Sequence, residues 1–154
     1  MFSHMDKNLR GHMVDISEKD ISLRQARAGG SIKMQKKTLE ALAQLQVEKG
    51  DVLAVAQIAA IQGAKKTPDF IPLAHPILLQ GVAVNFEYEE EGIYCEVTVK
   101  SQGKTGVEME ALTACSAALL TIYDMCKALD KTMEITGISL LEKTGGRSAY
   151  YEKK

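Results

Sequence analysis

The stretch from Gly106 to Asp130, GVEMEALTACSAALLTIYDMCKALD, constrains the fold more than any other part of the chain. After Glu110 it contains neither glycine nor proline, and it is rich in alanine, leucine and methionine, which favour helices. About twenty helical residues would extend ~30 Å at ~1.5 Å per residue. The stretch therefore predicts one long helix.

A helical wheel divides this stretch into two faces. The broad apolar face comprises Leu112, Cys115, Leu119, Ile122, Met125, Cys126 and Leu129. The narrow polar stripe comprises Glu110, Thr113, Ser116, Thr121, Asp124 and Lys127. Either the stripe is a solvated face with an i,i+3 ion pair, or it lines a site, and the pattern alone leaves both interpretations open.

The two ends of the stripe are far apart. Glu110 and Asp124 are fourteen residues apart, which is ~21 Å along a helix axis. A single compact ligand would not reach both within one chain. Either the stripe serves two purposes, or two chains pack antiparallel and form an isologous site at their interface. We hypothesise the second arrangement, which full activity of a strictly monomeric protein would contradict.

Composition predicts one ordinary globular domain. The chain has 154 residues, of which 45% are hydrophobic and 25% charged. A net charge of -1 and only 5% aromatic residues argue against nucleic-acid binding. No apolar run approaches the ~20 residues of a membrane span, and no signal peptide is recognisable. We therefore expect a cytoplasmic protein without membrane contact.

Cysteine and histidine usage gives no indication of a metal site. The three cysteines, Cys95, Cys115 and Cys126, lack C-x-x-C spacing, and we expect them to be reduced. The histidines are His4, His12 and His75, and none is at metal-ligand spacing with a second strong ligand. No metal is expected.

The N-terminal third is the least regular part of the sequence. Residues 1–12 are polar without periodicity, so they are predicted to be disordered, and the MFSHM start resembles a cloning-derived sequence. Residues 13–154 then form a single domain. Met13–Gly30 is a mixed segment that would place Arg24 and Arg27 one turn apart if helical and that breaks at Gly29–Gly30. Ser31–Gln35 alternates like a short strand.

The remaining elements predict an α+β fold. Helices are expected at Thr38–Gln46 and Val52–Gln62, separated by Gly50 as a stop and Asp51 as an N-cap. A loop with three prolines, Gly63–Pro76, follows. Strands are expected at Leu79–Glu89, Ile93–Ser101 and Met133–Glu142, the first two joined as a hairpin. This order is typical of a ferredoxin-like sandwich, an antiparallel sheet covered by helices.

Polar residues without a structural task gather at the ends of the expected elements, and basic ones predominate. They are Arg24, Arg27, Lys49, Lys65, Lys66, His75, Glu108, Glu110, Asp124, Lys127, Lys143 and Arg147. This excess suits a ligand with several negative charges. The loop QGKTG is only a fragment of a phosphate loop, since G-x-x-x-x-G-K-[ST] is missing. Lys65 and Lys66 also fit an ordinary surface loop.

Three motifs support a family assignment. The segments MVDIS, IAAIQGAKKTPDFIPLAHP and GKTGVEMEALTACSAALLTIYDMCKALDK resemble the MoaC family, over about Met13 to Tyr150. The resemblance implies a ferredoxin-like subunit in a hexamer, a trimer of dimers, with active sites between subunits. It also implies a phosphorus–oxygen lyase that converts (8S)-3',8-cyclo-7,8-dihydroguanosine 5'-triphosphate to cyclic pyranopterin monophosphate and diphosphate without a cofactor. That reaction is an early step of molybdenum cofactor (molybdopterin) biosynthesis.

The resemblance also implies site residues, which we carry over motif by motif. The catalytic residues would be Lys49, Asp124 and Lys127. Substrate-binding residues would be Leu73, Ala74, His75, Glu108, Met109, Glu110, Lys143 and Arg24. As candidates for stabilising the charge of the departing diphosphate we add Lys65, Lys66 and Arg147 to Arg24. We expect Lys49 and Lys127 to act as general acid and base, with Asp124 orienting Lys127. The short tail after Arg147 departs from the family pattern.

A different class of protein remains as the alternative. The same features fit a non-catalytic, oligomeric module that binds nucleotides or other metabolites for regulation. That module would tolerate Lys49→Ala and Lys127→Ala with binding intact, whereas the enzyme would lose turnover.

Overall fold

Strand β1 (Ser22–Lys33) lies in the middle of the sheet in the computed structural model, which describes residues 3–154. It pairs antiparallel with β3 (Gly92–Gly103) on one side and with β4 (Glu134–Thr144) on the other. The edge strands are β2 (Leu79–Glu89) and the short β5 (Tyr150–Glu152), which gives the order β2-β3-β1-β4-β5. The predicted α+β class with an antiparallel sheet is confirmed, and the strand order is consistent with a ferredoxin-like fold.

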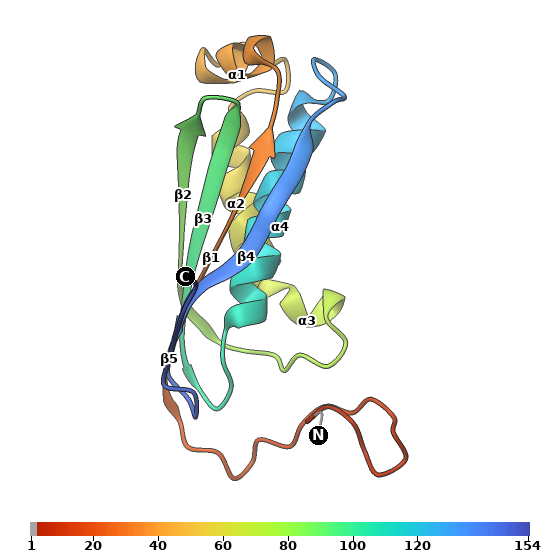
Figure 1. The fold of residues 1–154 in the computed structure, drawn as a ribbon, viewed down its shortest axis with the longest axis vertical. Coiled ribbons are helices and arrows are strands. Elements are labelled where there is room, and N and C mark those ends of the chain that lie inside the picture. The colour runs from red at the N-terminus through yellow and green to blue at the C-terminus, as the bar shows by residue number, and fades with distance from the viewer. Residues whose placement is uncertain (1–2) are drawn as a thin grey trace.

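Two helices cover one face of this sheet and lie side by side (Figure 1). They are α2 (Val52–Lys65) and α4 (Glu108–Cys126). Helix α1 (Lys36–Ala43) lies at one end of the molecule, and α3 (Thr67–Phe70) lies at the other. The first turn of α4 is at the α3 end and its last turn is at the α1 end, so α4 joins the two ends of the molecule.

The core lies between the sheet and the two helices, and the predicted patterns account for most of it. Cys95, Val97 and Val99 alternate along β3 and are fully buried. The apolar face predicted for α4 is buried from Cys115 to Cys126, and Leu112 is partly buried. Leu129 is 45% exposed because α4 ends three residues earlier, at Cys126. The three cysteines are free and buried, as expected.

Helices α2 and α4 approach each other closely at a glycine. A Cβ added to Gly63 would lie 2.8 Å from the Cβ of Ala117 and 3.2 Å from the carbonyl oxygen of Thr113. Real Cβ atoms do not approach this closely, so a side chain at position 63 would force the helices apart. The start of α2 is held by the predicted cap, since the Asp51 carboxylate accepts a 3.0 Å hydrogen bond from the Ala54 amide.

The N-terminal third differs from the sequence prediction. Ser22 to Lys33 is one continuous strand, so Arg24 and Arg27 do not lie on a helix, and the glycine pair does not interrupt the element. Tyr94 packs over Gly29, and Ile138 and Leu119 pack over Gly30. The two glycines therefore leave room for large side chains to pack against a central strand. The sequence pattern alone had predicted a break at this point.

Smaller differences concern element ends. The predicted loop before β2 contains the short helix α3, α1 ends at Ala43, and β5 was not predicted. Residues 3–12 carry an isolated bridge between Met5 and Gly11, and residues 1 and 2 of the segment predicted to be disordered lie outside the described residues. No helix in residues 3–154 is long and apolar enough to cross a membrane.

Candidate functional site

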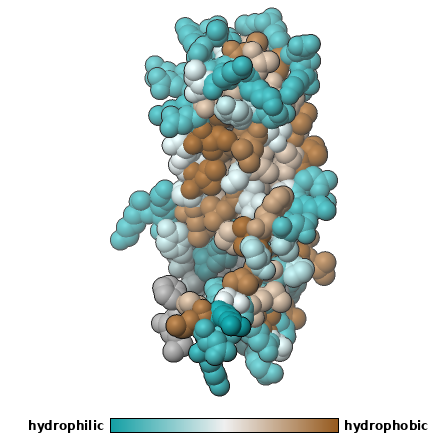
Figure 2. Space-filling view, turned by 90° about the vertical axis from the view of Figure 1, so that its right-hand side faces the viewer, coloured by the Kyte–Doolittle hydropathy of each residue, from teal (hydrophilic) through white to brown (hydrophobic). Residues whose placement is uncertain are grey.

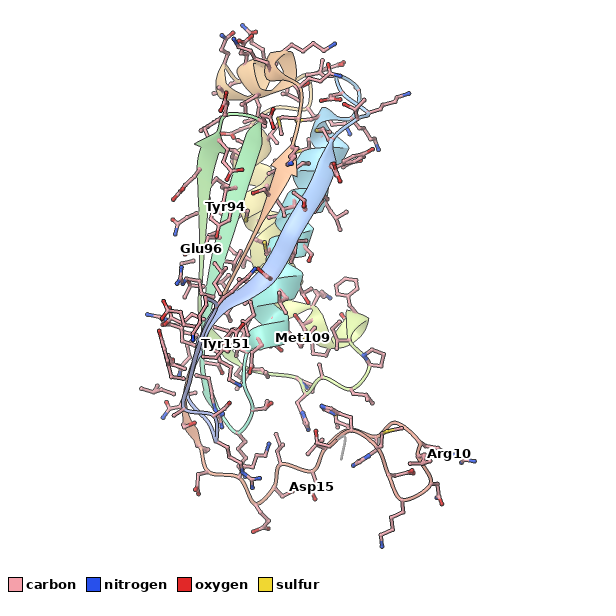
Figure 3. All side chains as sticks on the ribbon, viewed as in Figure 1. Arg10, Asp15, Tyr94, Glu96, Met109 and Tyr151 are labelled. Atoms are coloured by element: carbon pink, nitrogen blue, oxygen red, sulfur yellow. The ribbon has the colours of Figure 1, made fainter. Side chains whose placement is uncertain are left out.

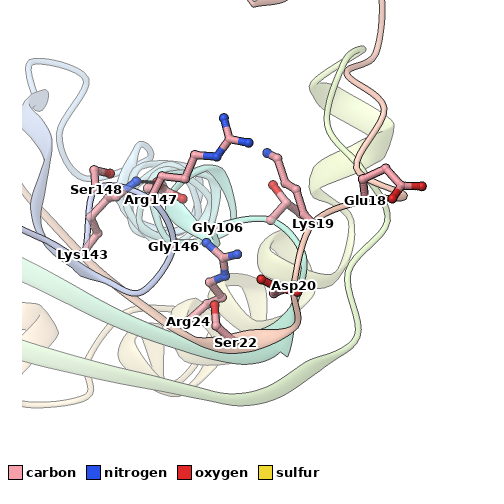
Figure 4. Close-up of a pocket in the computed structure, with 12 residues that line it drawn as sticks. Glu18, Lys19, Asp20, Ser22, Arg24, Gly106, Lys143, Gly146, Arg147 and Ser148 are labelled. Atoms are coloured by element: carbon pink, nitrogen blue, oxygen red, sulfur yellow. Dashed lines mark hydrogen bonds and ion pairs between the residues drawn. The ribbon is translucent and has the colours of Figure 1, made fainter.

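Four basic side chains surround a cavity of about 590 Å³ at the α3 end of the molecule, here called the first cavity. They are Lys19, Arg24, Lys143 and Arg147. Figure 4 shows Lys19, Arg24 and Arg147 pointing into the same space, whereas the Glu18 carboxylate points away from it. Converging guanidinium and ammonium groups are well suited to hold phosphate oxygens.

The folded backbone holds these cations in place. Arg24 projects from β1 and its Nε donates to the Gly103 carbonyl at 3.2 Å. Gly146 has φ +81° and lies against the Arg24 guanidinium, where a Cβ would not fit. The Ser22 hydroxyl lines the same cavity and is buried without a hydrogen-bond partner among the described residues. A ligand oxygen in the cavity would be a suitable partner.

A second cavity, of about 880 Å³, adjoins the first. Its walls include all six residues predicted from the IPLAHP and VEMEAL motifs: Leu73, Ala74, His75, Glu108, Met109 and Glu110. Residues that line both cavities include Lys19, Glu108 and Arg147. The two cavities therefore share a wall, with more apolar surroundings on the side of Leu73 and Met109.

Glu108 and Glu110 begin α4 and have different surroundings. Glu108 forms an ion pair with Lys143, which brings two of the predicted residues together. Glu110 is 3% exposed, and among the described residues it has no ion-pair partner. Desolvation by burial, reinforced by the nearby Glu108 charge, raises the pKa of Glu110 to about 7. A carboxyl group with this pKa can give or take a proton near neutral pH.

The predicted catalytic residues meet at the opposite end of α4. The Asp124 carboxylate accepts from Lys127 Nζ at 2.6 Å and from Lys49 Nζ at 3.2 Å. These side chains are 46–58% exposed, and they line neither cavity in the described chain. Hydrogen bonds from Lys127 and then Lys49 lower the pKa of Asp124, and Asp124 in turn raises the pKa of Lys127. Within one chain, Lys49, Asp124 and Lys127 thus form a solvent-exposed ion cluster.

The middle of the polar stripe lines neither of the two cavities in residues 3–154. The Ser116 hydroxyl donates to the Leu112 carbonyl at 2.8 Å, and the Thr121 hydroxyl donates to the Ala117 carbonyl at 2.7 Å. Each hydroxyl is thus satisfied by the carbonyl four residues earlier. Of the stripe residues, Glu110 alone lines either cavity in the described chain.

The structure divides the predicted site residues into three groups. The first lies at the cavities, the second is the cluster of Lys49, Asp124 and Lys127, and the third is Lys65 and Lys66 at the end of α2. Lys66 is 3.8 Å from Asp69, and Lys65 and Lys66 line neither of the two cavities in the described chain. Lys19, Ser22 and Thr105 line the cavities but were not predicted. The excess of basic residues at element ends is a signal that fits Lys19, whereas no sequence signal pointed to Ser22 or Thr105.

The fold and the cavities define an α+β domain suited to a small anionic ligand. Residues 13–146 match the MoaC family. A "Cyclic pyranopterin monophosphate synthase" from Peptoclostridium acidaminophilum is 50% identical over 153 residues, which are 99% of this chain and 98% of that protein. A protein of the same name from Natranaerobius thermophilus is 52% identical over 99% of this chain and 98% of its own length. Another, from Desulfitobacterium hafniense, is 54% identical over 97% of this chain and 92% of its own length. The chain belongs to the MoaC family.

Within residues 3–154, no three or more His, Cys, Asp or Glu side chains are placed so that they could hold a metal ion. The side chains that line the cavities include acids, bases and cations. These groups can bind phosphates and move protons.

Proposed function

We propose that this chain converts (8S)-3',8-cyclo-7,8-dihydroguanosine 5'-triphosphate to cyclic pyranopterin monophosphate with release of diphosphate. This reaction is an early step of molybdenum cofactor biosynthesis. The names of relatives at about half identity over nearly their whole length support it. The structural observation that carries the proposal is the joining of a cationic cavity to a second, more apolar cavity that contains a buried carboxyl group.

The two cavities match the two parts of this substrate. Its triphosphate would lie in the first cavity, where Lys19, Arg24 and Arg147 would offset the charge of the departing diphosphate. Its ring system would lie in the second cavity, beside Leu73 and Met109. Loss of diphosphate by formation of a cyclic phosphate makes the enzyme a phosphorus–oxygen lyase. The proposal includes no metal or redox cofactor.

Rearrangement of the purine requires proton transfers at several atoms. Glu110 is suited to these proton transfers, because its pKa of about 7 lets both protonation states exist at neutral pH. His75, on the wall of the second cavity, is a further acid–base group within the same space. Lys49 and Lys127 stay predicted catalytic residues, although the raised pKa of Lys127 in the single chain is opposite to what a general base needs.

Pairing of two copies would resolve this conflict. If two chains pack antiparallel, the cluster of Lys49, Asp124 and Lys127 on one chain would face the cavities of the other. Removal of water at the interface lowers the pKa of a lysine. Figure 2 shows apolar side chains gathered midway along one side of the molecule, between hydrophilic ends. Ile58 on α2 and Leu120 on α4 are each 60% exposed, which suits burial in an interface.

The assembly that we propose is a hexamer, a trimer of such dimers, with active sites between subunits. We include a cytoplasmic location in the proposal because the substrate derives from a guanosine nucleotide. Sedimentation of the purified protein measures the assembly directly, and a stable monomer with full activity would contradict it.

The test of the function is to incubate the purified protein with the cyclised nucleotide. We expect stoichiometric diphosphate and cyclic pyranopterin monophosphate. Lys143→Met is the informative variant, because it removes a cation of the first cavity and leaves Glu108 without its partner. It should raise KM for the nucleotide about tenfold or more. Binding of the nucleotide without product would favour the regulatory module.

A further inference from the structure

The segment of residues 13–19, here called the strap, runs along the α3 end of the molecule. Figure 3 shows Asp15 on the strap at the same end of the molecule as Met109, which lies in the first turn of α4. The strap belongs to no helix or strand. Its residues Val14, Ile16 and Lys19 nevertheless form part of the wall of the second cavity. The position of the strap therefore decides the shape of the site.

Two side chains hold the strap against the rest of the chain. Lys104 Nζ donates to the Ser17 carbonyl at 2.6 Å, and His75 Nε2 lies 2.7 Å from the Val14 carbonyl oxygen. No other hydrogen bond or ion pair between the strap and residues 20–154 is formed. Within the strap, the Asp15 carboxylate accepts from the amide and the hydroxyl of Ser17, at 2.8 and 2.6 Å. These bonds stiffen the turn that presents the Ser17 carbonyl to Lys104.

Electrostatics agree with this placement of Lys104. The hydrogen bonds from Ser17 lower the pKa of Asp15, and the nearby positive charge of Lys104 lowers it further. Lys104 thus donates to the Ser17 carbonyl and lies close to the Asp15 carboxylate, which orders the turn. Lys104 is the lysine of the QGKTG loop. Because this loop is only a fragment of a phosphate loop, the sequence alone gave Lys104 no role.

The bond to Val14 has a chemical consequence for His75. A carbonyl oxygen only accepts hydrogen bonds, so Nε2 of His75 must carry the proton. In a neutral imidazole the other nitrogen, Nδ1, is then the one that can accept a proton. The strap therefore selects one tautomer of a residue on the wall of the second cavity.

We propose that Lys104 is a positioning residue, whose bond to the Ser17 carbonyl holds the strap so that Val14 fixes the tautomer of His75. The same bond keeps Lys19, two residues further on, at the wall between the two cavities. Lys104 itself lines neither cavity in the described chain, so it acts through the strap. The effect on catalysis rests on the proposed function, whereas the effect on the strap and on His75 does not.

The test compares three variants of the full-length protein. Lys104→Met removes the donor and keeps the apolar stem, Lys104→Arg keeps a donor, and Lys100→Met is the matched control on the exposed surface of β3. The tautomer of His75 is read from long-range proton–nitrogen correlations of imidazole-labelled protein, with His75→Gln for assignment. We expect His75 to be protonated at Nε2 alone in the wild type and in mixed tautomers in Lys104→Met.

Two further measurements separate positioning from simple loss of stability. Trypsin cleavage after Lys19, followed by mass spectrometry, should be about tenfold faster in Lys104→Met, because one charge-assisted hydrogen bond is lost. The kcat for the cyclised nucleotide should fall about tenfold, while Lys104→Arg and Lys100→Met behave as the wild type. Unchanged cleavage and tautomer in Lys104→Met would overturn the proposal.

The outcomes also distinguish this proposal from the proposed function. If the wild type makes no product, the proposed function fails, and the cleavage and tautomer measurements still decide whether Lys104 holds the strap. If the wild type is active and Lys104→Met frees the strap with kcat unchanged, the positioning role is wrong.

Discussion

The two ends of helix α4 place similar side chains in opposite environments. At the first turn, Glu110 is 3% exposed and its pKa is raised to about 7 by burial. At the last turn, the Asp124 side chain is 58% exposed and its pKa is lowered by Lys127 and Lys49. Among the described residues, the buried acid at the first turn has no ion-pair partner, whereas the ion cluster at the last turn lines neither of the two cavities.

This difference shows what each end requires for catalysis. The cavity end has volume, cations and a carboxyl group that titrates near neutrality. The cluster end has two exposed lysines that both bond to Asp124, and the hydrogen bond to Asp124 raises the pKa of Lys127. Substitutions at each end, and midway between them, test whether the two ends act on the same ligand.

The largest effect is expected from Lys127→Gln. If Lys127 transfers a proton, kcat should fall on the order of 10³-fold. The free energy of unfolding should stay close to that of the wild type, because exposed ion pairs contribute little to stability. Steady-state kinetics and thermal unfolding measure the two quantities, and Lys131→Gln is a control at the same end of the molecule. Retained turnover in Lys127→Gln would show that the cluster is only surface.

Mixing two inactive variants tests whether the ends of different chains meet. In an isologous dimer of one Glu110→Gln chain and one Lys127→Gln chain, one of the two sites has neither substitution. Random pairing should therefore restore about a quarter of the wild-type activity. Co-expression with two affinity tags allows the mixed species to be purified. A mixture that stays inactive would mean that each chain carries its own complete site.

Glu110→Gln should also change how stability depends on pH. The pKa of Glu110 is about 7 in the folded protein, against 4.5 ordinarily. The folded state therefore keeps a proton that the unfolded chain loses. This contribution to stability is fully present below about pH 4.5 and is lost as the pH rises through about 7, by roughly 3 kcal/mol in total.

The neutral amide of Glu110→Gln does not suffer that loss. The variant should thus be more stable than the wild type at pH 8, with the difference shrinking towards pH 5. Chemical unfolding at both pH values measures it. Glu108→Gln is the matched control, and it should lose stability at pH 8 because Lys143 is left unpaired. Parallel pH curves for the wild type and Glu110→Gln would contradict the raised pKa.

The smallest effect is expected midway along the helix. Thr121→Val removes a hydroxyl that is already satisfied by the Ala117 carbonyl. Turnover should stay within about twofold and the free energy of unfolding within about 1 kcal/mol. A large loss of activity would show that the whole polar stripe lines a ligand site. That result would remove the distinction between the two ends and the helix that joins them.

Much of the fold was predictable because its signals are local. The long helix lacks glycine and proline after Glu110, and the hairpin strands alternate clearly, so α4, β2 and β3 were placed within a few residues. The cap at Asp51 was predicted from its position after Gly50. The six residues of the IPLAHP and VEMEAL motifs do line one cavity, and the cluster around Asp124 does form.

What escaped prediction depends on contacts between distant segments. Gly29 and Gly30 suggest a break when taken alone, and only Tyr94, Leu119 and Ile138 show why a central strand needs them. Lys19 belongs to a segment without periodicity, and its place at the cavities depends on where the strap packs. A hydroxyl such as that of Thr121 counts as polar on a helical wheel, although its own helix satisfies it.

The close contact of Gly63 with Ala117 fixes the position of α4 against α2. Because α2 packs against it, α4 sets the separation between the cavities and the ion cluster of its own chain, and in the proposed pairing it would also set where the cluster meets the cavities of another copy. Inserting one residue would shift the far end by ~1.5 Å and turn it by ~100°. Substitutions on its outer surface would leave that separation unchanged. The length of α4 would therefore be under selection as strict as the selection on its side chains.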